Sequence, residues 1–122
     1  MPATIGHDGP ITGSPALLAA ARHTARQTDV SLLAGSVFTS DVFYEPNDDA
    51  QKLHTANGVL CVEMECAALY SIAAMEGAEA LAVFTMTDHL VHHQFLSAQE
   101  RQEGVDEMIE LALNTAVAAT TE

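Results

Sequence analysis

The sequence predicts an α/β fold, in which a three-layer sandwich places helices on both faces of a mainly parallel or mixed sheet. Segments with the 3.6-residue period of amphipathic helices alternate with short apolar segments that are typical of buried strands. The chain has 122 residues, of which 48% are hydrophobic, so it can bury one core. We therefore expect a single domain over residues 1–122.

The first helix is expected from about Pro15 to Gln27. Ser14 is a favourable N-cap, and proline is favoured at the first helical position. Apolar residues then recur on one face, namely Leu17, Leu18, Ala21 and Ala25. The next segment, Val30 to Phe38, has the composition of a strand.

The middle of the chain predicts a turn, a strand and a second long helix. The turn sequence YEPNDD at 44–49 leads to a short helix near 49–56, and residues 58–62 are typical of a buried strand. From Glu63 the pattern becomes helical, and Gly77 is the expected stop. One side of this helix is apolar, with Met64, Ala67, Ala68, Ile72 and Met75.

The last part of the chain predicts a third strand at 81–87 and a final helix. Ser97 and Glu100 have the spacing of a capping box. The expected apolar face of this helix contains Val105, Met108, Ile109, Ala112 and Ala116. Three strands make a thin sheet, so we expect a fold that is incomplete relative to a full α/β sheet.

Charge and composition exclude several classes of protein. The formal net charge is −13, and a surface of that sign repels the backbone of nucleic acids. No apolar run approaches the roughly 20 residues that span a bilayer. Cys61 and Cys66 have neither a CxxC nor a zinc spacing, so they are expected to be reduced thiols. We expect a cytoplasmic protein that binds neither nucleic acid nor membrane.

Acidic residues stand where predicted elements end, which is where open α/β sheets build their sites. Glu63 and Glu65 begin a predicted helix, and Asp88 follows a predicted strand. Taken singly, the two glutamates fit a role as helix caps, because carboxylates are favoured in a first helical turn. Asp88 could equally be a loop or cap residue.

Other candidate residues also have structural explanations when taken one at a time. Met64 has the spacing of a core residue, Phe43 could end a strand, and Arg101 could pair with acidic neighbours on its helix. His89, His92 and His93 permit two metal ligands on one turn, but no thiol or carboxylate completes a set. We therefore predict no metal site.

The joint spacing of five motifs changes these odds. The motifs are FY at 43–44, VEME at 62–65, GAEAL at 77–81, TDH at 87–89 and AQERQ at 98–102. In this order they resemble the carboxy-terminal half of bacterial-type, hexameric purine nucleoside phosphorylases, over residues 30–119. Asp88 and Arg101 favour the purine branch of that family over the uridine branch.

The resemblance implies a catalytic pair that acts on the leaving base. Breaking a purine N-glycosidic bond places negative charge on the base, and a carboxylic acid beside N7 can donate a proton to it. Asp88 resembles that acid. Arg101 resembles the arginine that stabilises the carboxylate left behind.

The resemblance also implies the residues that bind substrate. Glu65 resembles the ligand of the ribose 2′- and 3′-hydroxyls, and Met64 resembles the methionine that packs beneath the ribose. The remaining members of the predicted substrate-binding set are Phe43 on the purine, Val62 and Glu63 lining the base site, and Thr87, where the family commonly has serine.

The implied reaction is phosphorolysis of purine nucleosides or deoxynucleosides to free base and (deoxy)ribose 1-phosphate. Inorganic phosphate is the co-substrate, no metal or organic cofactor is implied, and the resemblance implies a homo-oligomer. Apart from Arg101, however, the cations are Arg22, Arg26 and Lys52, and no glycine-rich loop follows a strand. In the family, the phosphate ligands belong to the amino-terminal half.

We therefore expect the chain to hold the purine and ribose half of a site without the phosphate half. The alternative is a non-catalytic remnant of the family that binds nucleosides or pairs with another subunit. A hydrolytic nucleosidase needs a base that activates water, and the sequence offers no convincing candidate.

Overall fold

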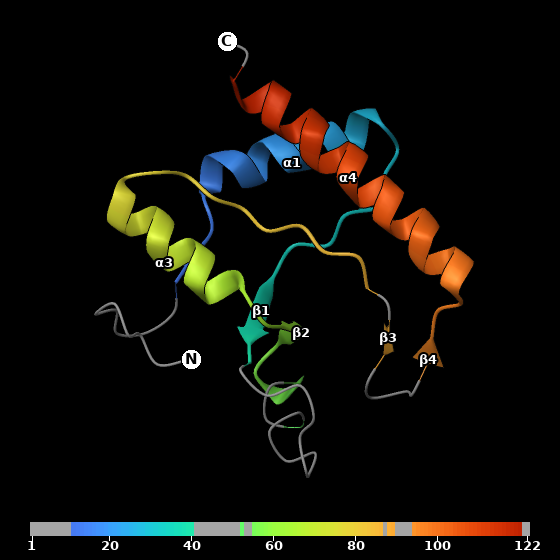
Figure 1. Ribbon diagram of the computed structural model, residues 1–122. Helices are drawn as coiled ribbons and strands as arrows, with labels where there is room; N and C mark the ends of the chain where they lie inside the picture. Colours follow the sequence, from blue (N-terminus) through green and yellow to red (C-terminus); the bar gives the residue numbers. More distant parts are fainter. Residues whose placement is uncertain (1–10, 41–51, 53–54, 87, 90–93, 121–122) are drawn as a thin grey trace. The chain divides into compact units, whose positions relative to one another are not determined.

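The computed structural model describes residues 11–40, 52, 55–86, 88–89 and 94–120 (Figure 1). In chain order its elements are α1 (Pro15–Gln27), β1 (Ser36–Thr39), β2 (Val59–Glu63), α3 (Cys66–Glu76), β3 (Asp88–His89), β4 (Gln94–Phe95) and α4 (Ala98–Thr120). They form two compact units, one with β1, β2 and α3 and the other with α1, β3, β4 and α4. Helices with a parallel strand pair confirm the α/β class, while the single domain stays a prediction.

In the first unit, β1 and β2 pair in parallel, as the sequence predicts. Val37 pairs with Cys61, and Thr39 pairs with Glu63 at the last step of the register. The amide of Ser40 extends the ladder by donating to the carbonyl of Glu63 at 2.8 Å. The carboxyl ends of both strands therefore lie together, at the edge from which the chain enters α3.

The helix α3 begins at Cys66, three residues later than predicted, because Glu63 is still paired in β2. It ends where expected: Gly77 adopts a left-handed φ of 66°, and the amide of Ala78 donates to the carbonyl of Ala73 at 2.8 Å. Glycine adopts this conformation without the steric cost of a Cβ.

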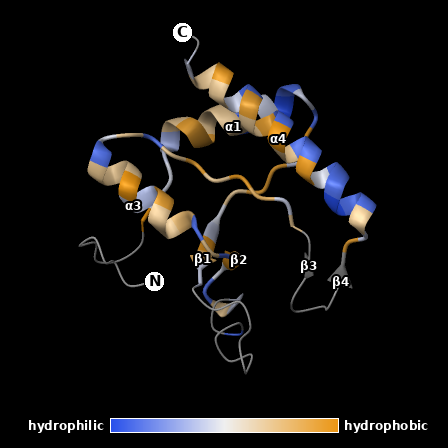
Figure 2. Ribbon diagram, in the orientation of Figure 1, coloured by the Kyte–Doolittle hydropathy of each residue, from blue (hydrophilic) through white to orange (hydrophobic). Residues whose placement is uncertain are grey.

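The apolar side predicted for α3 is covered only in part, with Ala67 and Ala68 half-buried. Ile72 and Met75 are 56% and 61% exposed, whereas Cys66 and Ser71 are buried. Hydrophobic residues colour most of the visible ribbon of α3 (Figure 2). A helix that is apolar on several sides gives no single face from its sequence period, so packing alone decides which side is covered.

In the second unit, α1 packs against α4. The predicted bounds of α1 are confirmed, and the hydroxyl of Ser14 caps it by accepting from the amide of Leu17 at 3.1 Å. Ala21 and Ala25 are buried as expected, and Thr24 is buried beside them. Small side chains on this face let the two helices approach closely.

The capping box of α4 is also confirmed. The amide of Glu100 donates to the Ser97 hydroxyl at 3.1 Å, and the amide of Ser97 donates to the Glu100 carboxylate at 3.0 Å. The pKa of Glu100 is lowered, first by the hydrogen bond from the Ser97 amide to its carboxylate and then by the Ser97 side chain, because the charged carboxylate is the better acceptor.

The predicted apolar face of α4 is only partly right. Val105 and Met108 are half-buried as predicted, but Ile109 is 48% exposed, and Ala112 and Ala116 are exposed too. Leu111 and Thr115 are buried in their place. The buried side of α4 is thus rotated from the predicted stripe, because the fit to neighbouring elements decides which residues are covered.

Two strand predictions are wrong in their bounds. Of the predicted strand at 30–38 only the part from Ser36 is extended and paired, and residues 81–86 form no strand. A strand requires a neighbour to receive its hydrogen bonds, and the contact that is observed here is with α4: the Thr85 hydroxyl donates to the carbonyl of Gly104 at 2.9 Å.

Two further expectations are tested only in part. Residues 52 and 55–56 are helical, but the rest of the predicted short helix near 49–56 lies outside the described residues. Within the described part of the chain, none of the helices is both long enough and apolar enough to cross a membrane.

Candidate functional site

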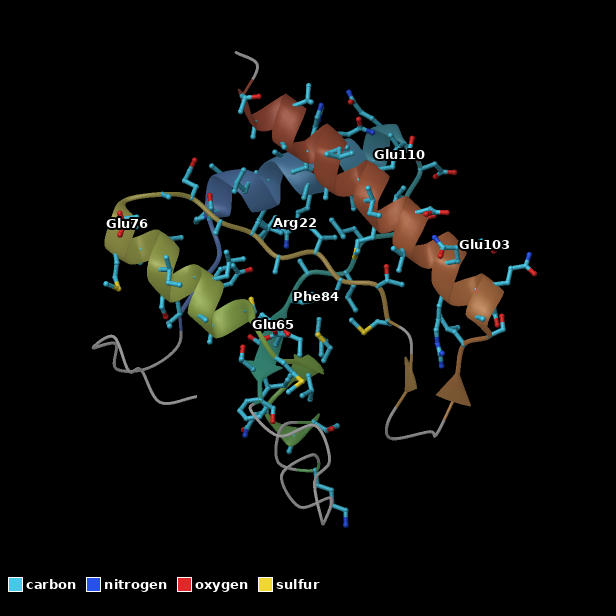
Figure 3. All side chains as sticks on the ribbon, viewed as in Figure 1. Arg22, Glu65, Glu76, Phe84, Glu103 and Glu110 are labelled. Carbon is cyan, nitrogen blue, oxygen red and sulfur yellow. The ribbon has the colours of Figure 1, made fainter. Side chains whose placement is uncertain are left out.

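Residues 62–65 join the end of β2 to the start of α3 (Figure 3, where Glu65 is labelled). Two apolar side chains of this segment are unusually open to solvent, with Val62 at 43% and Met64 at 39% exposure. They alternate with two carboxylates, Glu63 and Glu65. The carboxyl edge of the parallel pair thus presents apolar surface and negative charge together, a combination suited to a polar ligand with an apolar face.

The carboxylate of Glu63 is engaged inside the protein. One of its oxygens accepts a hydrogen bond from the hydroxyl of Thr39. The other accepts from the amides of Glu65 and Cys66, each at 2.7 Å. Glu63 therefore caps α3 from the end of β2, as the cap explanation of this residue requires.

Thr39 extends the same arrangement by one amide. Its hydroxyl oxygen accepts from the amide of Ala67 at 3.0 Å while its proton goes to Glu63. Three consecutive amides at the start of α3, those of residues 65 to 67, are thereby satisfied by two side chains. They are the groups that a helix start otherwise offers to an anion.

Glu65 differs from Glu63 in both exposure and bonding. It occupies the N-cap position of α3 with φ −129° and ψ −18°, and its side chain makes no capping hydrogen bond. It is exposed, whereas Glu63 is half-buried. Of the two glutamates, Glu65 is the one whose carboxylate faces solvent and can accept hydrogen bonds from a ligand.

The two cysteines beside this segment are free thiols, as the sequence predicts. Burial raises the pKa of Cys66, even though a hydrogen bond with Tyr70 lowers it, and the negative charge of Glu63 adds to the rise. Burial and Glu63 likewise raise the pKa of Cys61. Both thiols are therefore protonated near neutral pH and are poor nucleophiles.

The predicted catalytic residues belong to the second unit. Asp88 opens β3 and pairs with Phe95 in β4. Arg101 lies in the first turn of α4, is exposed, and donates its amide to the carbonyl of Ser97 at 3.0 Å. The structure thus brings Val62, Glu63, Met64 and Glu65 together in one unit, and it places Asp88 and Arg101 in the other.

The other predicted positions fall outside the described residues, namely Phe43, Thr87, His92 and His93. The described parts of the chain contain no group of three or more histidine, cysteine or acidic side chains that could hold a metal ion.

Comparison with known proteins identifies the family. The family model of the Phosphorylase superfamily matches residues 4–121. The chain belongs to this superfamily. It is 44% identical over 117 residues to a DeoD-type purine nucleoside phosphorylase of Myxococcus xanthus. The matched residues make up 96% of this chain and 49% of that relative. The resemblance predicted from the five motifs is thus confirmed.

Two further relatives carry similar names. A DeoD-type 1 purine nucleoside phosphorylase of Shewanella oneidensis is 42% identical, over 93% of this chain and 48% of the relative. A DeoD-type enzyme of Geobacillus stearothermophilus is 46% identical, over 83% of this chain and 43% of the relative. The chain spans about half the length of the curated relatives it matches.

In this member of the superfamily, Thr39 is the site residue that sequence reasoning missed. It stands one position beyond the predicted strand at 30–38. A signal was available, however: the parallel pairing of two successive strands places the residue that ends one beside the residue that ends the other. Thr39 and Glu63 are that pair.

Proposed function

We propose that the chain supplies the purine and ribose half of a site for phosphorolysis of purine nucleosides or deoxynucleosides, with inorganic phosphate as co-substrate. The products are the free base and (deoxy)ribose 1-phosphate. The observation that carries the proposal is the Glu65 carboxylate, which is exposed, makes no capping hydrogen bond and stands next to exposed Met64 after the end of β2. The relatives of the chain are named purine nucleoside phosphorylases.

On this proposal Glu65 accepts hydrogen bonds from the 2′- and 3′-hydroxyls of the ribose. As the bond to the base breaks, the sugar acquires oxocarbenium character, and a nearby carboxylate both orients and stabilises it. Met64 packs beneath the sugar with a flexible, polarisable side chain. Val62 belongs to the lining of the base site, together with Phe43 and Thr87, and Glu63 follows Val62 at the end of β2.

Asp88 is the proposed acid that protonates N7 of the leaving base, and Arg101 stabilises the carboxylate that remains. Both residues belong to the second unit, and the short β3–β4 pair and the first turn of α4 carry them. The capping box formed by Ser97 and Glu100 fixes the start of the helix that holds Arg101.

The phosphate half of the site is proposed to come from outside this set of residues, through a homo-oligomer or another part of the assembled enzyme. The start of α3 supports this view, because Glu63 and Thr39 already occupy the amides that could hold an anion. Of the four Lys and Arg residues, Arg22 and Arg26 lie on α1, Lys52 lies between β1 and β2 in the chain, and Arg101 is assigned to the Asp88 carboxylate.

Release of hypoxanthine from inosine by the purified chain, measured with and without phosphate, tests the proposal. When assembly of the chain completes the phosphate half of the site, the release depends on phosphate and Asp88→Asn abolishes it. The matched control is Asp29→Asn, an exposed residue with φ 56°, a conformation that asparagine tolerates well, and it should leave the release unchanged. Release that is the same without phosphate would instead support a hydrolase.

A non-catalytic nucleoside-binding or subunit-pairing remnant is the second candidate. Its supporting observation is the exposed apolar surface of α3, where Leu69, Ile72 and Met75 are each between 47% and 61% exposed. Inosine binding that phosphate does not alter, without release of hypoxanthine from a folded protein, would favour this candidate over the enzyme.

A further inference from the structure

The hydrogen bonds around Glu63 connect three elements within one compact unit. Thr39 ends β1, Glu63 ends β2, and both side chains bond to the first amides of α3. Thr39 is only 8% exposed, so its hydroxyl makes these hydrogen bonds with little access to water. There a lost hydrogen bond is not easily replaced by a bond to solvent.

The bonding of Glu63 leaves its carboxylate poorly suited to contact substrate. It accepts from one hydroxyl and two amides, and the amide bonds are 2.7 Å long, which is typical of strong bonds to a charged acceptor. To bind a nucleoside directly, Glu63 would have to give up bonds that hold the start of α3. Glu65, which is exposed, has no such capping bond to lose.

The backbone of Glu65 is what these bonds hold. Its own amide and the amide that follows both donate to one oxygen of Glu63, and the next amide donates to Thr39. A side chain on a fixed backbone has fewer accessible positions. A protein group that is already held in its binding position loses less entropy when the ligand binds, so it binds the ligand more tightly.

We propose that Thr39 and Glu63 are positioning residues, which fix the backbone of Glu65 and thereby set the affinity of the chain for the ribose part of a nucleoside. The inference rests on the proposed function, in which Glu65 binds the ribose hydroxyls. It adds Thr39 to the residues on which the site depends, and it assigns Glu63 an action through Glu65 rather than through direct contact.

The test compares the affinity of the full chain for inosine with its affinity for hypoxanthine, which lacks the ribose. Thr39→Val removes the hydroxyl at nearly constant volume, and Thr39→Ser restores it. Glu65→Gln is the positive control. Thr115→Val is the matched negative control, because Thr115 is also buried and its hydroxyl has no partner among the described residues.

We expect Thr39→Val and Glu65→Gln each to weaken inosine binding by roughly ten- to a hundredfold, the range that corresponds to the loss of a bond to a charged group. Hypoxanthine binding should change little in either variant. Thr39→Ser should recover most of the inosine affinity, and Thr115→Val should alter neither ligand. If Thr39→Val does not fold, Glu63→Gln is the alternative variant. It keeps the Thr39 hydroxyl and removes one of the two Glu63 oxygens that accept hydrogen bonds from Thr39 and from the amides of residues 65 and 66.

Two results would overturn the inference while leaving the proposed function intact. In the first, Glu65→Gln weakens the binding of inosine but not of hypoxanthine, while Thr39→Val leaves the binding of inosine unchanged. The other is Thr39→Val weakening both ligands equally, since that is the signature of a general structural defect. Failure of the unmodified chain to bind inosine would instead overturn the proposed function, and with it the role assigned to Glu65.

Discussion

Gly104 lies in the first half of α4, where Thr85 approaches the helix backbone. The Thr85 hydroxyl donates to the carbonyl of Gly104 at 2.9 Å. A Cβ added at Gly104 would lie 2.7 Å from the Cγ2 methyl of Thr85, whereas the other nearby atoms of Thr85 would be 3.9 Å away. The methyl group is thus the single obstacle to a side chain at this position.

Two opposing effects decide the outcome of Gly104→Ala. Alanine in place of glycine stabilises a helix interior by about 0.5–1 kcal/mol. Forcing a methyl group into a well-packed contact costs about 1–3 kcal/mol. We expect the clash to win, with a net loss of about 1 kcal/mol in the free energy of unfolding.

Thr85→Ser removes the Cγ2 methyl but keeps the hydroxyl that bonds to Gly104. In this background Gly104→Ala meets no close atom, so it should stabilise the protein by the propensity gain of about 0.5–1 kcal/mol. The substitution should thus change sign between the two backgrounds, with a coupling energy of about 2 kcal/mol.

Urea unfolding followed by far-ultraviolet circular dichroism measures this cycle in four proteins. The signal reports mainly the second unit, because α1 and α4 are the longest helices described, with 13 and 23 residues. A coupling within about 0.5 kcal/mol of zero is the scatter expected for independent sites, and it would contradict a clash between the two side chains. It would mean that a Cβ at Gly104 does not meet the Cγ2 methyl of Thr85, the contact from which the coupling energy of about 2 kcal/mol is estimated.

Three further predictions concern packing and charge. Leu111→Ala should destabilise the protein by about 2–5 kcal/mol in urea unfolding, because Leu111 is 4% exposed, whereas Ile109→Ala should cost far less at 48% exposure; equal losses would contradict the observed face of α4. Ser97→Ala should raise the pKa of Glu100, measured by NMR titration, because the hydroxyl and amide bonds that lower it are lost or weakened. Since the folded pKa is lowered, the stabilisation by Glu100 is present above its unfolded pKa and is lost as the pH falls through the folded pKa; an unchanged pKa in Ser97→Ala would be inconsistent with this origin. Cys66 should react with iodoacetamide more slowly than a free thiol at neutral pH and faster after unfolding, because burial raises its pKa and blocks access; equal rates before and after unfolding would disagree with its buried position.

Local hydrogen bonds explain which parts of the fold could be predicted. The bounds of α1, the capping box of α4 and the stop at Gly77 all depend on bonds between residues three to five positions apart. Side chains and backbone that lie this close in the chain meet whatever the rest of the molecule does. Their patterns were therefore sufficient.

Contacts between distant residues explain the errors. Residues 81–86 have the composition of a strand, but Thr85 bonds to α4. α4 packs against α1, and its buried residues, Leu111 and Thr115, are not in the stripe that the sequence predicts. Composition does not indicate which element packs against a segment. The partner of residues 81–86 and the buried side of α4 therefore could not be predicted from the sequence.

For the candidate site, the spacing of the motifs was enough to predict the family, and the pattern placed the VEME segment where a predicted strand ends at Val62 and a predicted helix begins at Glu63. The difference between the two glutamates of this segment arises from the tertiary structure. Thr39 lies 24 residues before Glu63 in the chain, and only the parallel pairing of β1 with β2 brings its hydroxyl to that carboxylate. That pairing engages Glu63 within the protein and leaves Glu65 exposed to solvent.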